Sequence, residues 1–142
     1  MEINGKTRLL GLLGDPVQHT MSPLIHNTLS DILEINEVYV PFHTHKEGLA
    51  DAVKGAFELN ILGMNATVPH KNEVMASLVD IDDGAAAIGA VNTLVRTANG
   101  YKGYNTDMMG LSRELESYGV ELDGKKIIIL GAGGAARAVA YM

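Results

Sequence analysis

The feature of this sequence that most restricts its fold is a regular alternation between short apolar runs and longer amphipathic stretches. Apolar runs at residues 8–14, 37–42 and 63–68 have the length of buried strands, whereas residues 22–33 and 48–59 have the length and periodicity of helices. This alternation is typical of β-α-β units, in which helices connect parallel strands. It predicts an α/β fold with a mostly parallel open sheet flanked by helices.

Local signals place the remaining elements. Further helices are predicted over residues 71–78, 82–88 and 106–118. The pair Asn99-Gly100 predicts a hairpin between strands at residues 91–97 and 101–104.

The first predicted helix has a clear start signal. We expect Ser22 to cap it and Pro23 to occupy its first turn. Five apolar side chains spaced three and four apart are expected to form its buried face: Leu24, Ile25, Leu29, Ile32 and Leu33.

We expect a domain boundary after residue 118. Residues 119–142 would supply only an apolar strand at residues 125–130, a glycine turn and about two helical turns. A parallel strand needs neighbours and helices on both sides, so we expect this second domain to be truncated. The strand residues Ile127 to Leu130 are therefore predicted to be disordered, packed non-natively or paired with another copy of the chain.

Composition excludes several classes of protein. The net charge of −6 argues against a nucleic-acid partner, which needs clustered Lys and Arg. The absence of cysteine excludes a disulfide framework. No apolar run approaches the roughly 18 residues of a membrane span, and the amino terminus does not resemble a signal peptide. We expect a soluble, cytoplasmic protein.

The glycine turn follows a predicted strand and opens a predicted helix. Its residues are Gly131, Ala132, Gly133, Gly134 and Ala135. Glycines let the backbone approach a pyrophosphate, and the helix amino terminus offers free N–H groups. The context predicts a Rossmann-type dinucleotide site, although a plain strand-to-helix turn is the alternative. The residue that would separate NAD from NADP lies about 20 positions further on, so the sequence leaves this choice open.

Polar residues also stand where a purely structural interpretation would not place them. Thr20 and Ser22 lie between a strand and a helix, and both hydroxyls could reach one oxyanion there. Lys71 follows a strand end, where it could protonate a developing alkoxide. Asn92 lies in an apolar strand, and Asp107 lies at a helix start. The alternatives are a helix cap by Ser22 or Asp107 and a solvated lysine at position 71.

The histidines give no clear ligand pattern. His43 and His45 share a strand face and could bind a metal ion, but no acidic or cysteine cluster accompanies them in the sequence, so we predict no metal. His19, His26 and His70 lie in or beside the polar motifs without ligand spacing.

Taken together and in order, these segments resemble the shikimate dehydrogenase family. The matching stretches are residues 19–27, 65–71, 88–93, 105–107 and 131–135. Any one of these motifs is weak, but five in register along nearly the whole chain are specific.

The resemblance implies an activity: NADP-dependent, reversible reduction of 3-dehydroshikimate to shikimate, in the pathway to chorismate and the aromatic amino acids. Residues 1–118 would be the substrate-binding and catalytic domain. Lys71 would be the catalytic acid/base, paired with Asp107, and both would contact the substrate.

The resemblance also implies further site residues. Thr20 and Ser22 would hold the substrate carboxylate, and Thr67 and Asn92 would bind ring hydroxyls. The glycine turn, Gly131 to Ala135, would hold the NADP phosphates, and Asp83 matches a family position near the cofactor.

Two departures from the family pattern keep alternatives open. Thr20 stands where many relatives have serine, so a quinate/shikimate dehydrogenase of relaxed specificity is one alternative. Family members continue for about as many residues again, so we expect the 142-residue chain alone to lack turnover. A stand-alone, non-catalytic binding module is the other alternative. The sequence does not decide whether the chain forms a homodimer.

Overall fold

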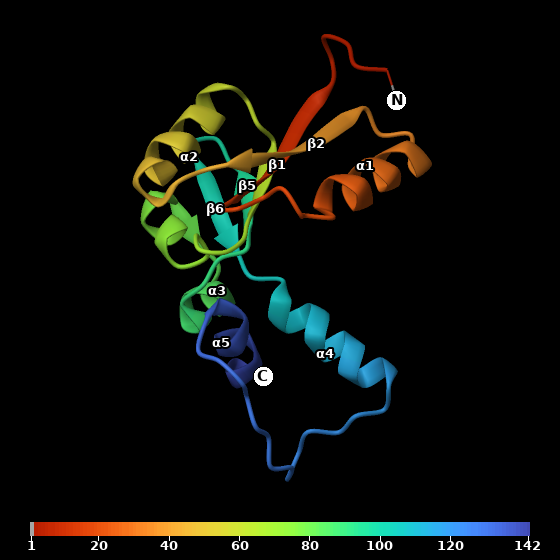
Figure 1. The fold of residues 1–142 in the computed structure, drawn as a ribbon, viewed down its shortest axis with the longest axis vertical. Coiled ribbons are helices and arrows are strands. Elements are labelled where there is room, and N and C mark those ends of the chain that lie inside the picture. The colour runs from red at the N-terminus through yellow and green to blue at the C-terminus, as the bar shows by residue number, and fades with distance from the viewer. Residues whose placement is uncertain (1) are drawn as a thin grey trace.

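The computed structural model describes residues 2–142 (Figure 1). They contain one six-stranded sheet with the strand order β2-β1-β3-β5-β6-β4. The strands are β1 (Arg8–Gly14), β2 (Glu37–His43), β3 (Gly63–Ala66), β4 (Asp80–Ile81), β5 (Thr93–Arg96) and β6 (Tyr101–Tyr104). Each strand predicted from residues 8–104 is present. The two-residue strand β4 was missed because it is too short to show an alternating pattern.

The helices also follow the predicted order. They are α1 (Ser22–Ile32), α2 (Leu49–Glu58), α3 (Asp83–Ile88), α4 (Asp107–Ser117) and α5 (Gly134–Tyr141), with short 3₁₀ helices η1 (Lys46–Gly48) and η2 (Glu73–Ser77). The helix expected at residues 71–78 is only the 3₁₀ turn η2. None of the helices among the described residues has the length and apolar character that a membrane span requires.

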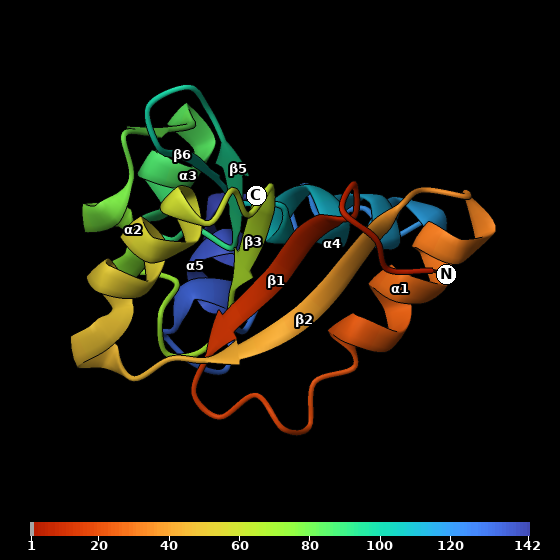
Figure 2. The same ribbon diagram turned by 90° about the horizontal axis from the view of Figure 1, so that it is seen from above.

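The pairing of the strands confirms a mostly parallel sheet. β1 pairs in parallel with β2 and β3, and β4 pairs in parallel with β6. The antiparallel pairs, β3 with β5 and β5 with β6, arise at the predicted hairpin, where Thr97 N–H donates to Gly100 O at 2.8 Å. Figure 2 shows β2, β1 and β3 side by side, so the carboxyl ends of these parallel strands lie at the same edge of the sheet.

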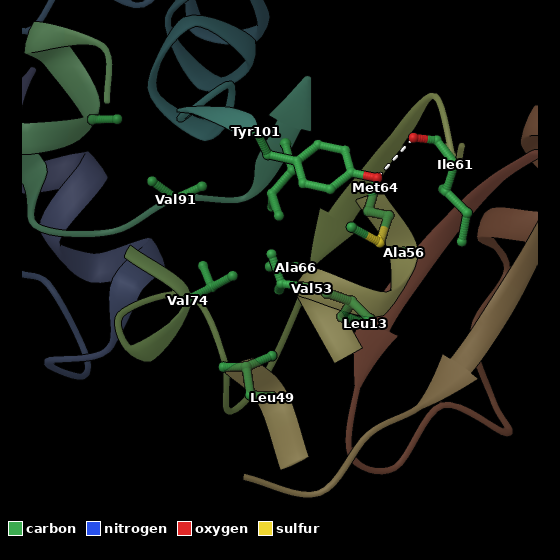
Figure 3. Packing of buried hydrophobic residues seen from close by; sticks show 12 residues of the cluster. Leu13, Leu49, Val53, Ala56, Ile61, Met64, Ala66, Val74, Val91 and Tyr101 are labelled. Carbon is green, nitrogen blue, oxygen red and sulfur yellow. Dashed lines mark hydrogen bonds between the residues drawn. The ribbon is translucent and has the colours of Figure 1, made fainter. Parts of the chain in front are cut away.

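The main hydrophobic core lies between the sheet and α2 (Figure 3). Leu13 and Met64 come from neighbouring strands, and Val53 comes from α2. Tyr101 is 1% exposed, and its hydroxyl donates to Ile61 O at 2.7 Å, which satisfies the one polar atom of this large buried side chain. This core fixes the strand ends that carry the polar residues.

The buried apolar face predicted for α1 is wrong. All five of its residues are exposed, with Leu29 the least so at 49% and Ile32 the most at 70%. The helix lies alongside the edge strand β2 and attaches to it through polar groups (Figure 2). Asn27 Nδ2 donates to Tyr39 O, and Tyr39 N–H donates to Asn27 Oδ1. The amide therefore completes the outer edge of β2, and the apolar stripe faces away from it.

The strand predicted at residues 125–130 is also wrong as a strand. This segment is extended but pairs with no strand in the described part of the chain, and Ile128 and Leu130 are 86% and 94% exposed. A strand forms only where another edge is available to it. This agrees with the expectation that the apolar run has no native-like sheet to enter. Figure 1 shows α4 and α5 beside each other, with the connecting segment looping away from the sheet.

Candidate active site

The candidate site centres on an ion pair between Lys71 and Asp107. Lys71 Nζ lies 2.6 Å from Asp107 Oδ2, and the two side chains are 20% and 32% exposed. The alternative that Lys71 is a solvated surface lysine is therefore wrong. A charged hydrogen bond of this length in a partly buried position holds both groups in a defined orientation.

Two different elements bring this pair together. Lys71 lies between β3 and η2, and its carbonyl accepts from Val91 N–H at 2.7 Å. Asp107 is the first residue of α4, directly after β6. Its carboxylate makes no capping hydrogen bond to that helix, so the capping alternative for Asp107 is also wrong. Thr106 occupies the cap position of α4, so the Asp107 carboxylate is not engaged in capping and can pair with Lys71.

Asn92 holds the second oxygen of the carboxylate. Its Nδ2 donates to Asp107 Oδ1 at 2.8 Å and to Thr106 Oγ1 at 3.0 Å. Its Oδ1 accepts from Thr106 N–H at 3.0 Å and from Thr93 Oγ1 at 2.8 Å. Asn92 is 8% exposed, and all its amide groups have partners, as a buried amide requires. Asn92, which was predicted from its apolar context, therefore holds the Asp107 carboxylate in position beside Lys71.

A second polar group joins this network from β2 and β3. Tyr39 O–H donates to Asn65 Oδ1 at 2.8 Å, and Asn65 Nδ2 donates to Asn92 O at 3.2 Å and Thr93 Oγ1 at 3.3 Å. Burial raises the pKa of Tyr39 to about 12, against a smaller lowering effect of the nearby Ser22 hydroxyl. Tyr39, Asn65 and Thr93 also line a cavity of about 420 Å³.

Our prediction omitted Tyr39, Asn65 and Thr93 from the site. Asn65 was recognisable, since it alternates with Thr67 along one strand, but nothing in the sequence pointed to the tyrosine 26 positions away.

Thr20 and Ser22 converge at the start of α1, as predicted. Thr20 O–H donates to Ser22 Oγ at 3.1 Å, and Ser22 N–H donates to Thr20 Oγ1 at 3.2 Å. The predicted cap by Ser22 is wrong, because α1 has Met21 at its cap position and makes no side-chain cap hydrogen bond. Both hydroxyls are partly exposed and adjacent, so they can donate to one carboxylate.

The glycine turn lies next to the catalytic candidate. A Cβ atom added at Gly134 would lie 3.3 Å from Lys71 Cδ and 3.3 Å from Ala90 Cβ. Arg137 and Ala138 of α5 fix this position, the first by a hydrogen bond to Gly89 O at 3.4 Å and the second by packing on Ile88 and Ala90. The structure thus brings the predicted phosphate-binding turn against the stem of Lys71.

The profile of the shikimate dehydrogenase substrate binding domain matches residues 12–94 of the chain. The chain belongs to this family. A shikimate dehydrogenase (NADP(+)) from Desulforamulus reducens is 50% identical over 97% of the chain, and one from Pyrococcus furiosus is 44% identical over 98%. The chain spans about half the length of the curated relatives it matches, 48% and 51% in these two cases.

Solved structures of the shikimate dehydrogenase family share the fold. A crystal structure of shikimate dehydrogenase in complex with NADP⁺ has a TM-score of 0.94 and 46% identity, with 98% of this chain and 48% of that chain covered. The Thermus thermophilus enzyme in complex with shikimate has a TM-score of 0.88 and 35% identity, over 95% of this chain and 51% of that one. A 5-ketofructose reductase from Gluconobacter has a TM-score of 0.87 and 34% identity, over 97% and 50%.

Two residues that the shikimate dehydrogenase resemblance assigned lie outside the hydrogen-bonded network. Thr67 follows β3, half-buried, and its Cγ2 would lie 2.5 Å from a Cβ atom at Gly14, so only glycine fits there. Asp83 is exposed in the first turn of α3. The structure therefore brings Lys71, Asn92 and Asp107 into direct contact, whereas Thr67 and Asp83 lie apart from them. The roles of all five residues are proposals.

Proposed function

We propose that this chain supplies the substrate-binding and acid/base residues for the NADP-dependent, reversible reduction of 3-dehydroshikimate to shikimate. The observation that carries the proposal is the ion pair of Lys71 with Asp107 at 2.6 Å, held by the buried Asn92. Membership of the shikimate dehydrogenase family supports it, and so does the name shared by the two relatives described above.

The proposed chemistry uses Lys71 as the acid. Reduction of a ketone adds a hydride to carbon and leaves negative charge on oxygen. The Lys71 ammonium neutralises this charge and donates its proton to the oxygen, which completes the alcohol. In the reverse direction the neutral amine accepts the hydroxyl proton. Asp107 keeps the Lys71 nitrogen in place during both steps through its Oδ2.

The polar groups around the pair suit a hydroxylated ring that carries a carboxylate. Thr20 and Ser22 would bind the carboxylate through their adjacent hydroxyls. Thr67 and Asn92 would bind ring hydroxyls, and Asp107 would accept a hydrogen bond from one of them. A site of this kind rejects analogues that leave its buried polar groups without partners.

The glycine turn fits a dinucleotide. Gly131 has a φ of +123°, which favours glycine, and an added Cβ atom at Gly131 or Gly133 would meet nothing within 4 Å. The backbone is therefore open at Gly131 and Gly133, and we propose that the turn from Gly131 to Ala135 holds a phosphate at the amino end of α5. NADPH bound there would supply the hydride. Asp83 is proposed as a further cofactor contact.

A second candidate is a related reaction on another polyhydroxylated substrate such as quinate. Thr20 carries a methyl group into the carboxylate end of the site, and the 5-ketofructose reductase from Gluconobacter shows that this fold also accommodates an enzyme with another named substrate. Assay of shikimate and quinate with both NADP⁺ and NAD⁺ separates the candidates by their kcat/KM values.

The test needs both halves of such an enzyme. This chain covers 48% of the Desulforamulus reducens relative. We would join residues 1–142 to the part of that relative that follows the matched region. The chimera is expected to reduce 3-dehydroshikimate with NADPH. In parallel, the 142-residue chain is titrated with shikimate and followed by NMR, with shifts expected at Thr20, Ser22 and Asn92. A folded chimera that binds NADPH and shikimate without turnover would instead favour a non-catalytic binding module.

Two further proposals concern the setting of the protein. We place it in the cytoplasm, where NADPH is available, and light scattering of the chimera would decide between a monomer and a homodimer.

A further inference from the structure

The structure brings one acidic residue to the two histidines that share the end of β2. His43 Nε2 lies 2.7 Å from Asp15 Oδ1, and His45 Nδ1 lies 3.0 Å from Asp15 Oδ2. One ligand atom from each of the three residues can be chosen so that all lie within 4.8 Å of one another. This cluster could not be recognised from the sequence, because Asp15 stands 28 positions before His43.

The register of the sheet explains why these three side chains meet. Gly14 of β1 is the partner of His43 in the parallel ladder, so Asp15 follows beside Thr44. Side chains alternate between the two faces of an extended chain, so His43 and His45 point to one face and Thr44 to the other. The Asp15 carboxylate lies between the two histidines. Their rings are 4.8 Å apart, centroid to centroid, in an edge-on arrangement.

The backbone beneath the cluster is held on several sides. Thr44 N–H donates to Gly14 O at 3.1 Å, and Asp15 N–H donates to Val68 O at 3.1 Å. Thr44 is 8% exposed, and its carbonyl accepts from the ring of the fully buried His70 at 2.6 Å. The ligand-bearing residues thus stand on a fixed frame, while their side chains are 33% to 72% exposed and free to adjust.

We propose that Asp15, His43 and His45 form a binding site for a divalent transition metal ion of the Zn²⁺ class. Two imidazoles and one carboxylate are a donor set that suits Zn²⁺, Ni²⁺ and Cu²⁺, and it leaves positions for water or another ligand. Around an ion with bonds of about 2.0–2.1 Å, tetrahedral ligand atoms lie about 3.3 Å apart. The two histidine nitrogens lie 2.7 and 3.0 Å from different oxygens of Asp15, so the carboxylate must turn one oxygen toward both nitrogens. The three ligand atoms, which lie within 4.8 Å of one another, must then close to about 3.3 Å.

The cluster belongs to none of the steps proposed for Lys71. It is joined to the segment before Lys71 by the hydrogen bonds from Asp15 N–H to Val68 O and from the His70 ring to Thr44 O, and neither bond involves the Lys71 side chain. The metal proposal therefore stands or falls independently of the dehydrogenase proposal, and it is measured by binding alone.

The experiment is titration of the metal-free 142-residue chain with ZnCl₂ by calorimetry. One ion per chain is expected, with a dissociation constant on the order of micromolar, which corresponds to about 8 kcal/mol of binding free energy. Cu²⁺ and Ni²⁺ are expected to bind as well, with Cu²⁺ the tightest, and Mg²⁺ not to bind. Cu²⁺ also allows electron paramagnetic resonance to show nitrogen coupling from two imidazoles.

Three single variants and one control complete the design. Asp15→Asn, His43→Gln and His45→Gln are each expected to weaken Zn²⁺ binding at least tenfold. His19→Gln, which removes an exposed imidazole outside the cluster, is expected to change it less than twofold. Because the three ligands are largely on the surface, circular dichroism of each variant should match the parent. The proposal is overturned if Zn²⁺ does not bind at concentrations up to about 100 times the expected dissociation constant. It is also overturned if the double variant with His43→Gln and His45→Gln binds Zn²⁺ as the parent does.

Discussion

Lys71 Nζ and Asp107 Oδ2 lie 2.6 Å apart, although 36 positions and five elements of secondary structure separate the two residues. The pair is partly buried, and its second carboxylate oxygen is bound by Asn92. An ion pair of this kind stabilises a fold only weakly unless other hydrogen bonds support it. Here the buried Asn92 amide supports the ion pair. This support favours a catalytic role for Lys71 and Asp107 over a purely structural one.

We predict that Lys71→Ala in the chimera lowers kcat by about 10²- to 10⁴-fold, with a much smaller change in KM. The reason is that the proton donor is needed in the transition state more than in the bound substrate. Steady-state assays with 3-dehydroshikimate and NADPH measure both constants. Lys102→Ala is the matched control, since it removes an ammonium paired with Asp80 on β4, and it should leave kcat unchanged. Parent-like turnover in Lys71→Ala would remove the mechanism proposed here.

We predict that Asn92→Ala lowers the free energy of unfolding by about 2–3 kcal/mol. The substitution removes a buried amide and leaves Thr106 N–H and one oxygen of Asp107 without their partners. Chemical denaturation of the 142-residue chain measures the change. Gln18→Ala, at an exposed position, is the control and should cost less than about 0.5 kcal/mol. Equal stability of the two variants would show that the Asn92 network adds nothing to the fold.

Most of the sheet was predictable because its strands and hairpin have local signals. The apolar run at residues 8–14 forms β1 as predicted, and Asn99-Gly100 favours a hairpin by itself. The errors concern segments whose structure depends on what covers them. The apolar side of α1 has the periodicity of a buried face, yet α1 is attached to β2 through Asn27. Residues 125–130 have the composition of a strand but no adjacent edge.

The candidate site was predictable to a different extent. Lys71, Asn92 and Asp107 were each found in polar motifs and meet in the structure as expected. Tyr39 and the Asp15 cluster were missed, because the register of parallel strands decides which distant residues meet at a strand end. No local pattern contains that register, since it comes from packing of whole elements.

We predict that Tyr39 ionises at a higher pH than a tyrosine in an unfolded chain. Burial raises its pKa to about 12, compared with about 10 in an unfolded chain. The folded state then keeps the proton longer, so the unfolded state loses it first and the free energy of unfolding falls as pH rises from about 10 to about 12. The contribution of Tyr39 to the free energy of unfolding is fully present below pH 10 and is lost above pH 12. It amounts to roughly 3 kcal/mol.

Ultraviolet titration of tyrosinate tests this prediction. Tyr39→Phe should remove the ionisation step above pH 11, whereas Tyr118→Phe, which removes a ring that is 76% exposed, should leave that step in place. A titration curve in which both variants lose the same step would contradict the assignment.

We predict that Gly134→Ala lowers kcat of the chimera by about tenfold without unfolding it. An added methyl group would lie 3.3 Å from both Lys71 Cδ and Ala90 Cβ, which is closer than ordinary contact. The Lys71 stem is the more flexible neighbour, so it should yield by a few tenths of an ångström and carry its ammonium away from Asp107. A misplacement of this kind at a reacting group is costly because the geometry of proton transfer is narrow.

The control for this variant is Gly110→Ala in the middle of α4, where an added Cβ meets nothing within 4 Å. That change should raise the free energy of unfolding by about 0.5–1 kcal/mol, because alanine favours a helix over glycine, and should leave kcat unaltered. Lys71→Arg combined with Gly134→Ala gives a further check. If Gly134→Ala acts through the stem of Lys71, the double variant will be no slower than Lys71→Arg alone; if the losses multiply, the glycine acts by a separate route, such as contact with the cofactor phosphates.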